Sequence, residues 1–471
     1  MTETIVADYV VKGAGAVGMA FVDELISSCD ATVAMVDRNH RPGGHWNDAY
    51  SHVRLHQPSS FYGVGSEPLG DDTIDRHGPN AGFYELASGA EVLAYFDRVM
   101  RHRFLPSGRV VYLPMSDLAD DGTVTSLLSG QRREVHGHRF VDATWSQMKV
   151  PSTSPPGYEV SAGATCAPPN DLPRLAARFD EYVVVGGGKT AMDACVWLLD
   201  NGVDPDRVRW IVPRDSWTLD RGNVQPGLEF FARFCQSLAD AAQAAAEAAT
   251  VEEMFERLEA CGELRRIDPD VTPTAYHCAI LSDGELELLR SIRGVVRLGH
   301  VSAIEQDRIV LDHGTIPTSP RCLHIDCSAA GIPVRPAIPV FDGNRITLQW
   351  VRTCQPAFSA ALIAHVEATV ADEDEKNLLC PPIAPPSVPI DWLRMFRTGF
   401  ATRMLWRSRP ELEDWIAVSR LDPFTKLVRT QLGADQQATA HLMRYLQHLE
   451  PAFSNVDRLL ADEALPVGVL D

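Results

Sequence analysis

A glycine motif near the N-terminus constrains the fold of this 471-residue chain more than any other feature. The motif is G-x-G-x-x-G, formed by Gly13, Gly15 and Gly18, and it follows a short apolar run. Apolar residues then recur at helical spacing, and a second apolar run ends at Asp37. This order predicts a strand–helix–strand unit whose glycines admit a pyrophosphate and whose acid accepts ribose hydroxyls. The alternative is a glycine-rich turn that binds nothing.

A second glycine turn follows the apolar run at residues 182–185. It reads G-x-G-x-x-A, with Gly186, Gly188 and Ala191, and its next strand ends at Arg214 instead of an acid. Arginine at this place favours an adenosine 2′-phosphate, and therefore NADPH over NADH, unless it is simply a solvated loop residue. Lys189 can contact a phosphate or lie on the helix surface. Two turns of different character predict two nucleotides: FAD, which stays bound, and NADPH, which delivers hydride and leaves.

The two units suggest an α/β fold with two Rossmann-type dinucleotide-binding domains, a helical insertion and a helical C-terminal tail. Proline-rich stretches at residues 151–173 and 381–389 mark the breaks between them. The expected parts are an FAD-binding domain in two pieces (1–150 and 321–384), an NAD(P)H-binding domain (151–320) with a helical insertion at about 222–300, and a helical C-terminal region (385–471).

The amino-acid composition restricts which binding partners and which cellular compartment are expected. The charge of −20, from 43 basic and 63 acidic residues, disfavours nucleic acid and anionic membranes as partners. Neither a signal peptide nor an apolar run long enough to span a bilayer is visible, and the histidines form no metal-binding pattern. The ten cysteines are scattered, without C-x-x-C, which predicts reduced thiols, a cytoplasmic location and no redox-active disulfide. The oligomeric state stays open.

Further stretches resemble the two-Rossmann flavoproteins, in particular the flavin-containing and N-hydroxylating monooxygenases. The run Gly43-Gly44-His45-Trp46 is similar to the G-G-x-W element of that family, whose backbone approaches the flavin. Residues 50–62 are similar to the family segment that passes beside the isoalloxazine ring. Residues 141–145 and 328–331 lie where the family has its two returning strands, so the resemblance covers about residues 8–370.

The resemblance also implies which residues touch the cofactors. His56 and Gln57 would hydrogen-bond near the flavin ring or the substrate, and they are the candidate catalytic residues. Trp46 would form a wall of the site. Gln355 opens a helix over about 356–370 whose positive N-terminus would face the flavin. The alternatives are structural histidines and an ordinary amphipathic helix. FAD-binding roles are implied for four successive residues: Gly43, Gly44, His45 and Trp46.

The expected function is an FAD-dependent oxidoreductase that NADPH reduces, acting as a monooxygenase on a small organic substrate and O₂. Two departures from the family bear on it: Trp145 replaces the glycine of A-T-G, and the signature F-x-G-x-x-x-H-x-x-x-(F/W) is absent from residues 148–175. The alternatives are an NADPH-dependent flavoprotein reductase or dehydrogenase without oxygen insertion, and a nucleotide-binding sensor that catalyses nothing. The aromatic and methionine residues of the tail are expected to be core, or else a lid or a subunit interface.

Overall fold

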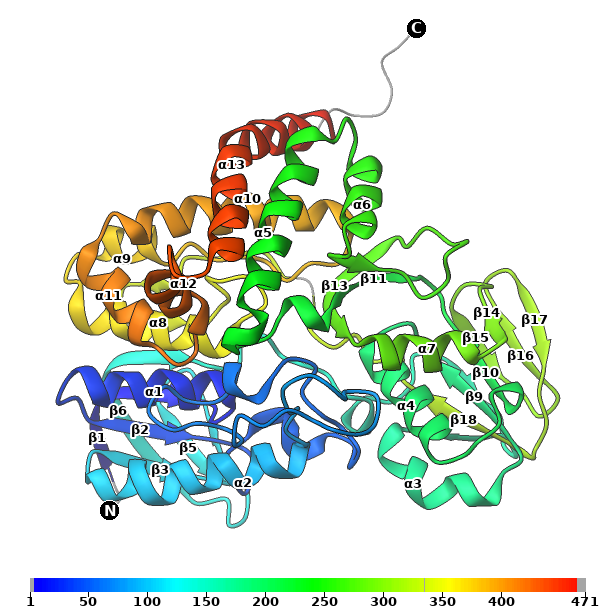
Figure 1. Cartoon of the computed structure of the whole chain (residues 1–471). Helices are drawn as coiled ribbons and strands as arrows, with labels where there is room; N and C mark the ends of the chain where they lie inside the picture. Colours follow the sequence, from blue (N-terminus) through cyan, green and yellow to red (C-terminus); the bar gives the residue numbers. More distant parts are fainter. Residues whose placement is uncertain (1–3, 334, 464–471) are drawn as a thin grey trace, which may run out of the picture.

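The computed structural model describes residues 4–333 and 335–463, and it contains two α/β units that lie side by side beneath a layer of helices (Figure 1). The first unit has the strand order β19-β20-β6-β1-β2-β3, in which β1 pairs in parallel with both β2 and β6. All four residues of β2 are buried because both of its faces are covered: Val33 and Met35 share a core with α1 and α8, and Ala34 and Val36 share another with β4 and β5. The bounds are β1 (Thr4–Lys12), β2 (Val33–Val36), β3 (Val110–Leu113), β4 (Ser116–Leu118), β5 (Thr123–Ser126), β6 (Arg132–Asp142), β19 (Phe341–Asp342), β20 (Arg345–Thr347), α1 (Ala16–Ser28), α2 (Gly89–Val99) and α8 (Pro356–Thr369).

The second unit is built on a parallel five-stranded sheet with the order β14-β10-β9-β18-β8. Two smaller sheets flank it, one with the order β12-β11-β13 and one with the order β17-β16-β15-β7. Its bounds are β7 (Glu159–Val160), β8 (Thr165–Ala167), β9 (Glu181–Val185), β10 (Val208–Ile211), β11 (Ser216–Asp220), β12 (Leu264–Arg265), β13 (Ala275–Leu281), β14 (Gly294–Val296), β15 (Val301–Ile304), β16 (Arg308–Leu311), β17 (Gly314–Pro317), β18 (Cys322–Asp326), α3 (Leu172–Leu175), α4 (Lys189–Asp200) and α7 (Asp283–Ser291).

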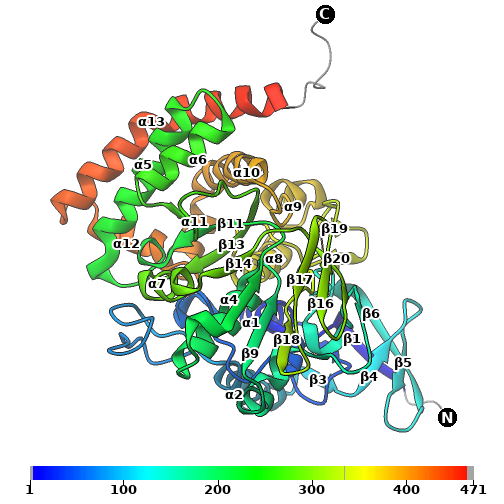
Figure 2. The ribbon, with the colours of Figure 1, turned by 90° about the vertical axis from the view of Figure 1, so that its right-hand side faces the viewer.

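The helical layer combines the insertion with the C-terminal tail. Figure 2 shows α5 lying along α13, although about 190 residues separate them in the chain. Trp392 and Met395 of the tail are buried against Trp217 of β11, so these two side chains are core. Within the described part of the chain, no helix is long and apolar enough to cross a membrane. The bounds are α5 (Phe231–Glu247), α6 (Val251–Ala260), α9 (Glu373–Leu379), α10 (Pro389–Arg407), α11 (Pro410–Val418), α12 (Pro423–Gln431) and α13 (Gln436–Glu463).

Two expected boundaries differ from the structure. The range 222–300 is not helical throughout, because it contains β12, β13 and β14 besides α5, α6 and α7, and β14 is the edge strand of the second sheet. The second piece of the first unit was expected to begin at residue 321. However, β18 pairs with β9 in the second sheet, and the chain re-enters the first sheet only at β19 and β20. The short apolar strand at 322–326 therefore closes the second unit.

The expectation that all the cysteines are reduced is wrong for one pair. Cys278 of β13 and Cys354, next to the N-cap of α8, form a disulfide with a Cα–Cα distance of 6.5 Å across 76 residues of sequence. The other eight cysteines are free thiols. Since a pair so distant in sequence has no spacing signature, the absence of C-x-x-C does not argue against disulfide chemistry here.

Candidate dinucleotide-binding sites

At the first glycine turn, two stretches of glycine backbone, one at Gly15 and one at Gly44, lie close together without side chains between them. A Cβ on Gly18 would lie 2.1 Å from the carbonyl oxygen of Gly13, so α1 packs against the turn only with glycine there. Gly44 has a φ of +55°, and a Cβ on it would lie 3.0 Å from the Cα of Gly15. Gly43 joins the two stretches, because its N–H donates to the carbonyl of Ala14. The geometry suits the close approach of a pyrophosphate.

The predicted residues of this turn converge on one cleft of about 460 Å³. It reaches from the end of β2 to the N-terminus of α8, where Trp350 and Pro356 line it. Residues 116–118 also line this cleft. An elongated cleft with two bare glycine stretches at its centre fits a dinucleotide. The sequence-predicted residues that line it are Gly13, Gly15, Asp37, Gly44 and His45.

Asp37 lies at the carboxyl end of β2 with its side chain buried. Its Oδ2 accepts a hydrogen bond from the N–H of Ala14 at 2.6 Å, and its Oδ1 accepts one from the N–H of Asn39 at 2.7 Å. Burial raises the pKa of this carboxyl group, and the two backbone donors oppose that shift. Each carboxylate oxygen keeps a second lone pair, so Asp37 can still accept ribose hydroxyls.

The N-terminus of α8 contributes an unpartnered polar atom. Gln355 is the N-cap of α8, and its Oε1 is buried without a hydrogen-bond partner. Buried polar atoms in native proteins are nearly always paired, so an orphan beside a cleft suits a group that binds there. The adjacent Pro356 lines the cleft, and the helix N-terminus carries a partial positive charge.

His45 and Trp46 lie on different sides of the 3₁₀ turn Gly44–Asp48. His45 lines the cleft, and burial lowers its pKa to about 4, so the imidazole is neutral at pH 7. Trp46 lines instead a neighbouring cavity of about 690 Å³, and its Nε1–H donates to the hydroxyl of Tyr62 at 2.8 Å. Tyr62 does line the cleft, so the expected wall role passes from Trp46 to Tyr62.

The second glycine turn also packs closely against a neighbouring strand end, but its backbone at Gly188 is exposed. A Cβ on Gly187 would lie 2.7 Å from the carbonyl oxygen of Arg214, so the end of β10 packs directly on the turn. Gly188, the N-cap of α4, has no atom within 4 Å of its Cβ position, whereas Ala191 is buried under the helix. Gly186 has a φ of +133°. The side chain of Arg214 is exposed and forms no ion pair among the described residues.

Lys189 does not lie on the helix surface, nor is its ammonium free for a phosphate. Its Nζ pairs with the carboxylate of Asp193 and lies 3.2 Å from Oε1 of Glu285. Burial opposes its charge, but the two carboxylates outweigh that effect and raise its pKa. From sequence alone, a lysine directly after a glycine turn is expected to bind phosphate. The two carboxylates that pair with Lys189 were not predicted, because they lie 4 and 96 residues further along the chain.

The two candidate catalytic residues do not line the cleft as the structure defines it. His56 lies at the junction of the two units, where its Nδ1 is buried without a partner. Burial lowers its pKa to about 4, and the nearby charges of Lys189 and Arg221 act in the same direction. Gln57 follows it, half-buried, in the same segment. Arg221 was missed from the sequence because it stands alone after β11, with no motif around it.

Two sheets with parallel central strands, each with a glycine turn that opens a helix, define a two-Rossmann α/β protein with the fold of the flavoproteins. No protein-family model matches the chain. It is 49% identical over 426 residues to uncharacterized proteins of Mycobacterium tuberculosis (strain H37Rv) and Mycobacterium bovis, and the match covers 90% of this chain and 79% of each relative. The chain belongs to the family of these mycobacterial proteins. Among solved structures it is similar to an oxidized steroid monooxygenase bound to NADP, with a TM-score of 0.52, 14% identity and 98% coverage of both chains, which shows the shared fold.

Proposed function

We propose that the protein is an FAD-dependent oxidoreductase that NADPH reduces. The observation that carries the proposal is the single cleft that joins the first glycine turn, the carboxylate of Asp37 and the N-terminus of α8. A dinucleotide with a redox-active ring needs these three features in this order: a place for the ribose, bare backbone for the pyrophosphate and a positive helix end for the reduced ring.

The residues would divide the work between two nucleotides. Gly13, Gly15 and Gly44 would hold the FAD pyrophosphate, while Asp37 accepts the ribose hydroxyls. Gln355 would hydrogen-bond the ring edge through its unpaired Oε1. When bound, the flavin supplies the electron-transfer chemistry, and the protein supplies position, electrostatics and control of water. The second site would use Gly186, Gly188 and Arg214, with Ala191 allowing α4 to pack close to its sheet.

A finer proposal is that the enzyme is a monooxygenase, which inserts one oxygen atom of O₂ into a small organic substrate. It rests on the family resemblance of residues 43–62 and on a fold shared with a protein titled steroid monooxygenase. The neutral His45 in the cleft is compatible with it, because it adds no charge beside the ring.

A reductase without oxygen insertion is the second candidate, and two observations favour it. Trp145 replaces a glycine of the family pattern, and residues 148–175 lack the family's linker signature. The disulfide between Cys278 and Cys354 also removes the argument that no cysteine pair exists.

Anaerobic titration of the FAD-loaded protein with NADPH tests the common part of both candidates. The flavin absorption band should bleach at about one equivalent of NADPH, and retention of the band would contradict an oxidoreductase. Air then separates the candidates. A monooxygenase forms oxygenated product in proportion to the NADPH consumed, whereas a reductase consumes NADPH with an acceptor such as ferricyanide, or with O₂ to give H₂O₂, and forms no oxygenated product. Asp37→Ala, which should lose FAD, is the control.

A further inference from the structure

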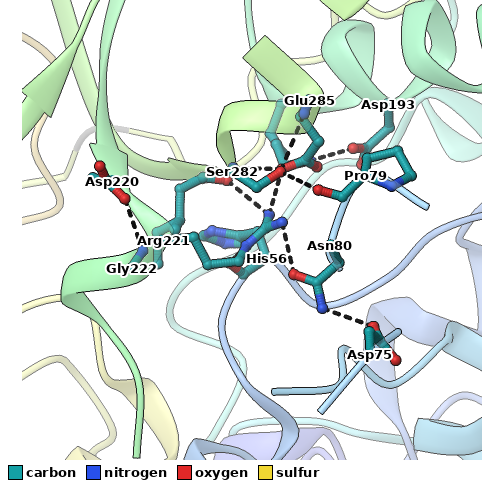
Figure 3. A network of polar contacts seen from close by, with 12 residues as sticks. His56, Asp75, Pro79, Asn80, Asp193, Asp220, Arg221, Gly222, Ser282 and Glu285 are labelled. Atoms are coloured by element: carbon teal, nitrogen blue, oxygen red, sulfur yellow. Dashed lines mark hydrogen bonds and ion pairs between the residues drawn. The ribbon is translucent and has the colours of Figure 1, made fainter. Parts of the chain in front are cut away.

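Arg221 is a fully buried arginine that contacts both nucleotide-binding units (Figure 3). Toward the first unit, its Nε donates to the carbonyl of His56 at 3.4 Å and its Nη1 donates to Oδ1 of Asn80 at 3.1 Å. Toward the second unit, its Nη2 lies 2.7 Å from Oε2 of Glu285 and donates to the carbonyl of Ile280 at 3.2 Å. One guanidinium therefore holds four groups from two units.

The chain of contacts continues through the start of α4 and returns to the first unit. Glu285 also pairs with Lys189, which pairs with Asp193. The hydroxyl of Tyr50, in the first unit, donates to Oδ2 of Asp193 at 2.6 Å. Burial raises the pKa of Glu285, but Lys189 and Arg221 outweigh burial and lower it to about 2. Two cations and two carboxylates thus balance each other between the units.

Neutral hydrogen bonds extend the same boundary. Oγ of Ser282 donates to the carbonyl of Pro79 at 2.6 Å, and the N–H of Tyr84 donates to Oε1 of Gln225 at 2.9 Å. The buried Gln225 donates in turn to the carbonyl of Arg221 at 2.9 Å. We call this set of contacts the polar seam: Tyr50, His56, Pro79, Asn80, Tyr84, Lys189, Asp193, Arg221, Gln225, Ser282 and Glu285.

The polar seam constrains the arrangement of the two units more than it adds to their stability. Buried ion pairs contribute little net stability, because desolvation offsets their attraction, but they hold their partners in one arrangement. The seam begins at Lys189, directly after Gly188 of the second turn, and ends at His56, in the segment expected to lie beside the flavin. It therefore sets how far the second glycine turn stands from that segment.

We propose that Arg221 and Glu285 are positioning residues that fix the separation and angle of the two nucleotide sites. This proposal rests on the proposed function, because it predicts an effect on the transfer between NADPH and FAD. A displacement of about 1 Å between reacting groups can slow a reaction about 100-fold. Loss of Arg221 therefore lowers the rate of flavin reduction at saturating NADPH, while the NADPH concentration for half-saturation stays within about threefold, since Arg221 touches neither glycine turn.

The first experiment measures anaerobic flavin reduction by stopped flow in the FAD-loaded full-length protein. Arg221→Gln is expected to lower the limiting rate about 10- to 100-fold. Arg221→Lys keeps the ion pair with Glu285 but loses the fork of contacts, so it should recover part of the rate. Lys376→Met is the matched control: it breaks a buried pair with Glu367, equally inaccessible but confined to the first unit, and it should leave the limiting rate unchanged.

The second experiment needs no cofactor. Hydrogen exchange of backbone amides in residues 50–57 and 79–84 should be faster in Arg221→Gln than in the wild type, and unchanged in Lys376→Met. If Arg221→Gln does not fold, Tyr50→Phe removes one hydroxyl of the seam and should speed exchange at residues 50–57 alone.

The outcomes separate the two proposals. A wild-type limiting rate in Arg221→Gln, or wild-type exchange in both segments, overturns the positioning role. A higher half-saturating concentration with an unchanged limiting rate also overturns it, because that result would make Arg221 a binding residue. If the wild-type flavin is not reduced by NADPH at all, the proposed function fails, and the exchange result alone then decides whether the seam joins the units.

Discussion

Lys189 and Arg214, the two cations at the second glycine turn, differ in whether their charge is available to a ligand. Lys189 forms ion pairs with Asp193 and Glu285, whereas Arg214 is exposed and has no ion pair among the described residues. The carbonyl of Arg214 lies against Gly187, so its side chain starts from the edge of the turn. A guanidinium in this place can bind a 2′-phosphate bidentately, which Lys189 cannot do without breaking the polar seam.

Arg214→Gln is therefore expected to raise the KM for NADPH about 10- to 100-fold, since a hydrogen bond to a charged group contributes about 1.5–3 kcal/mol. The KM for NADH should change less than about threefold. Steady-state kinetics with both nucleotides measures the difference, and Arg178→Gln, another exposed arginine of the second unit, is the control. Equal changes for the two nucleotides would show that Arg214 does not read the 2′-phosphate.

Three half-buried histidines with lowered pKa values predict how stability depends on pH. Burial lowers the pKa values of His45, His52 and His56 to about 4, below the unfolded value of about 6.5. The unfolded chain therefore binds protons first as the pH falls, so the stabilisation is complete above about pH 6.5 and is lost toward pH 4. Each histidine should cost about 1–2 kcal/mol between pH 7 and pH 5.

His52→Phe should reduce that pH dependence by one third. The ring of His52 packs at a tilt against Tyr50 and Trp197, and neither of its nitrogens has a hydrogen-bond partner, so phenylalanine keeps the ring contacts and removes the titration. Urea unfolding of the apoprotein at pH 7 and pH 5 gives the free energies of unfolding. An unchanged difference between the two pH values in this variant would mean that His52 is not buried as a neutral group.

At the level of elements, the sequence predicts those that local rules govern. The spacing S-x-x-E at Ser88 and Glu91 predicts a helix start, and in the structure these residues form a capping box before α2, which begins at Gly89. The two strand–turn–helix units are confirmed because apolar runs and glycines report a buried strand and a tight turn directly. The strand β14 was missed, since its three residues carry no alternation and follow a helix-rich stretch. The polar seam was missed for a related reason: its residues come from five separate segments.

We call the close approach of residues 44–48 to Gly15, before the start of α1, the cradle. It predicts the effect of one added methyl group. Gly44→Ala places a Cβ 3.0 Å from the Cα of Gly15 and forces alanine to a φ of +55°. FAD affinity should fall at least tenfold, because the added carbon pushes residues 44–48 away from Gly15 and so disturbs the glycine turn expected to hold the pyrophosphate. Gly78→Ala meets the same backbone restriction, with a φ of +76° and nothing within 4 Å, so it should lose about 1–2 kcal/mol of stability and no FAD affinity. Equal FAD affinity in both variants would argue against the cradle.

Across the whole molecule, contacts of different chemistry join the second unit to the first, among them the polar seam and the disulfide. The polar seam joins them at the level of the glycine turns, through charges and hydrogen bonds. The disulfide joins β13, whose Ile280 also accepts a hydrogen bond from Arg221, to the approach of α8, whose N-terminus lines the cleft. The helical layer then covers both, because α5 comes from the second unit and packs along α13 of the tail. The orientation of the units is thus specified by long-range contacts.

A single substitution can test the contribution of the disulfide to stability. Closing a loop of 76 residues restricts the unfolded chain, which corresponds to about 4 kcal/mol in the chain-entropy model and about 2–4 kcal/mol in practice. Cys278→Ser should therefore unfold several degrees below the wild type without reductant, and the two should unfold together when a thiol reductant is present. Cys261→Ser removes an exposed free thiol and should behave as the wild type in both conditions. If the wild-type melting temperature ignores the reductant while alkylation finds Cys278 and Cys354 as thiols, the covalent link does not form, and the polar seam alone must hold β13 near the cleft.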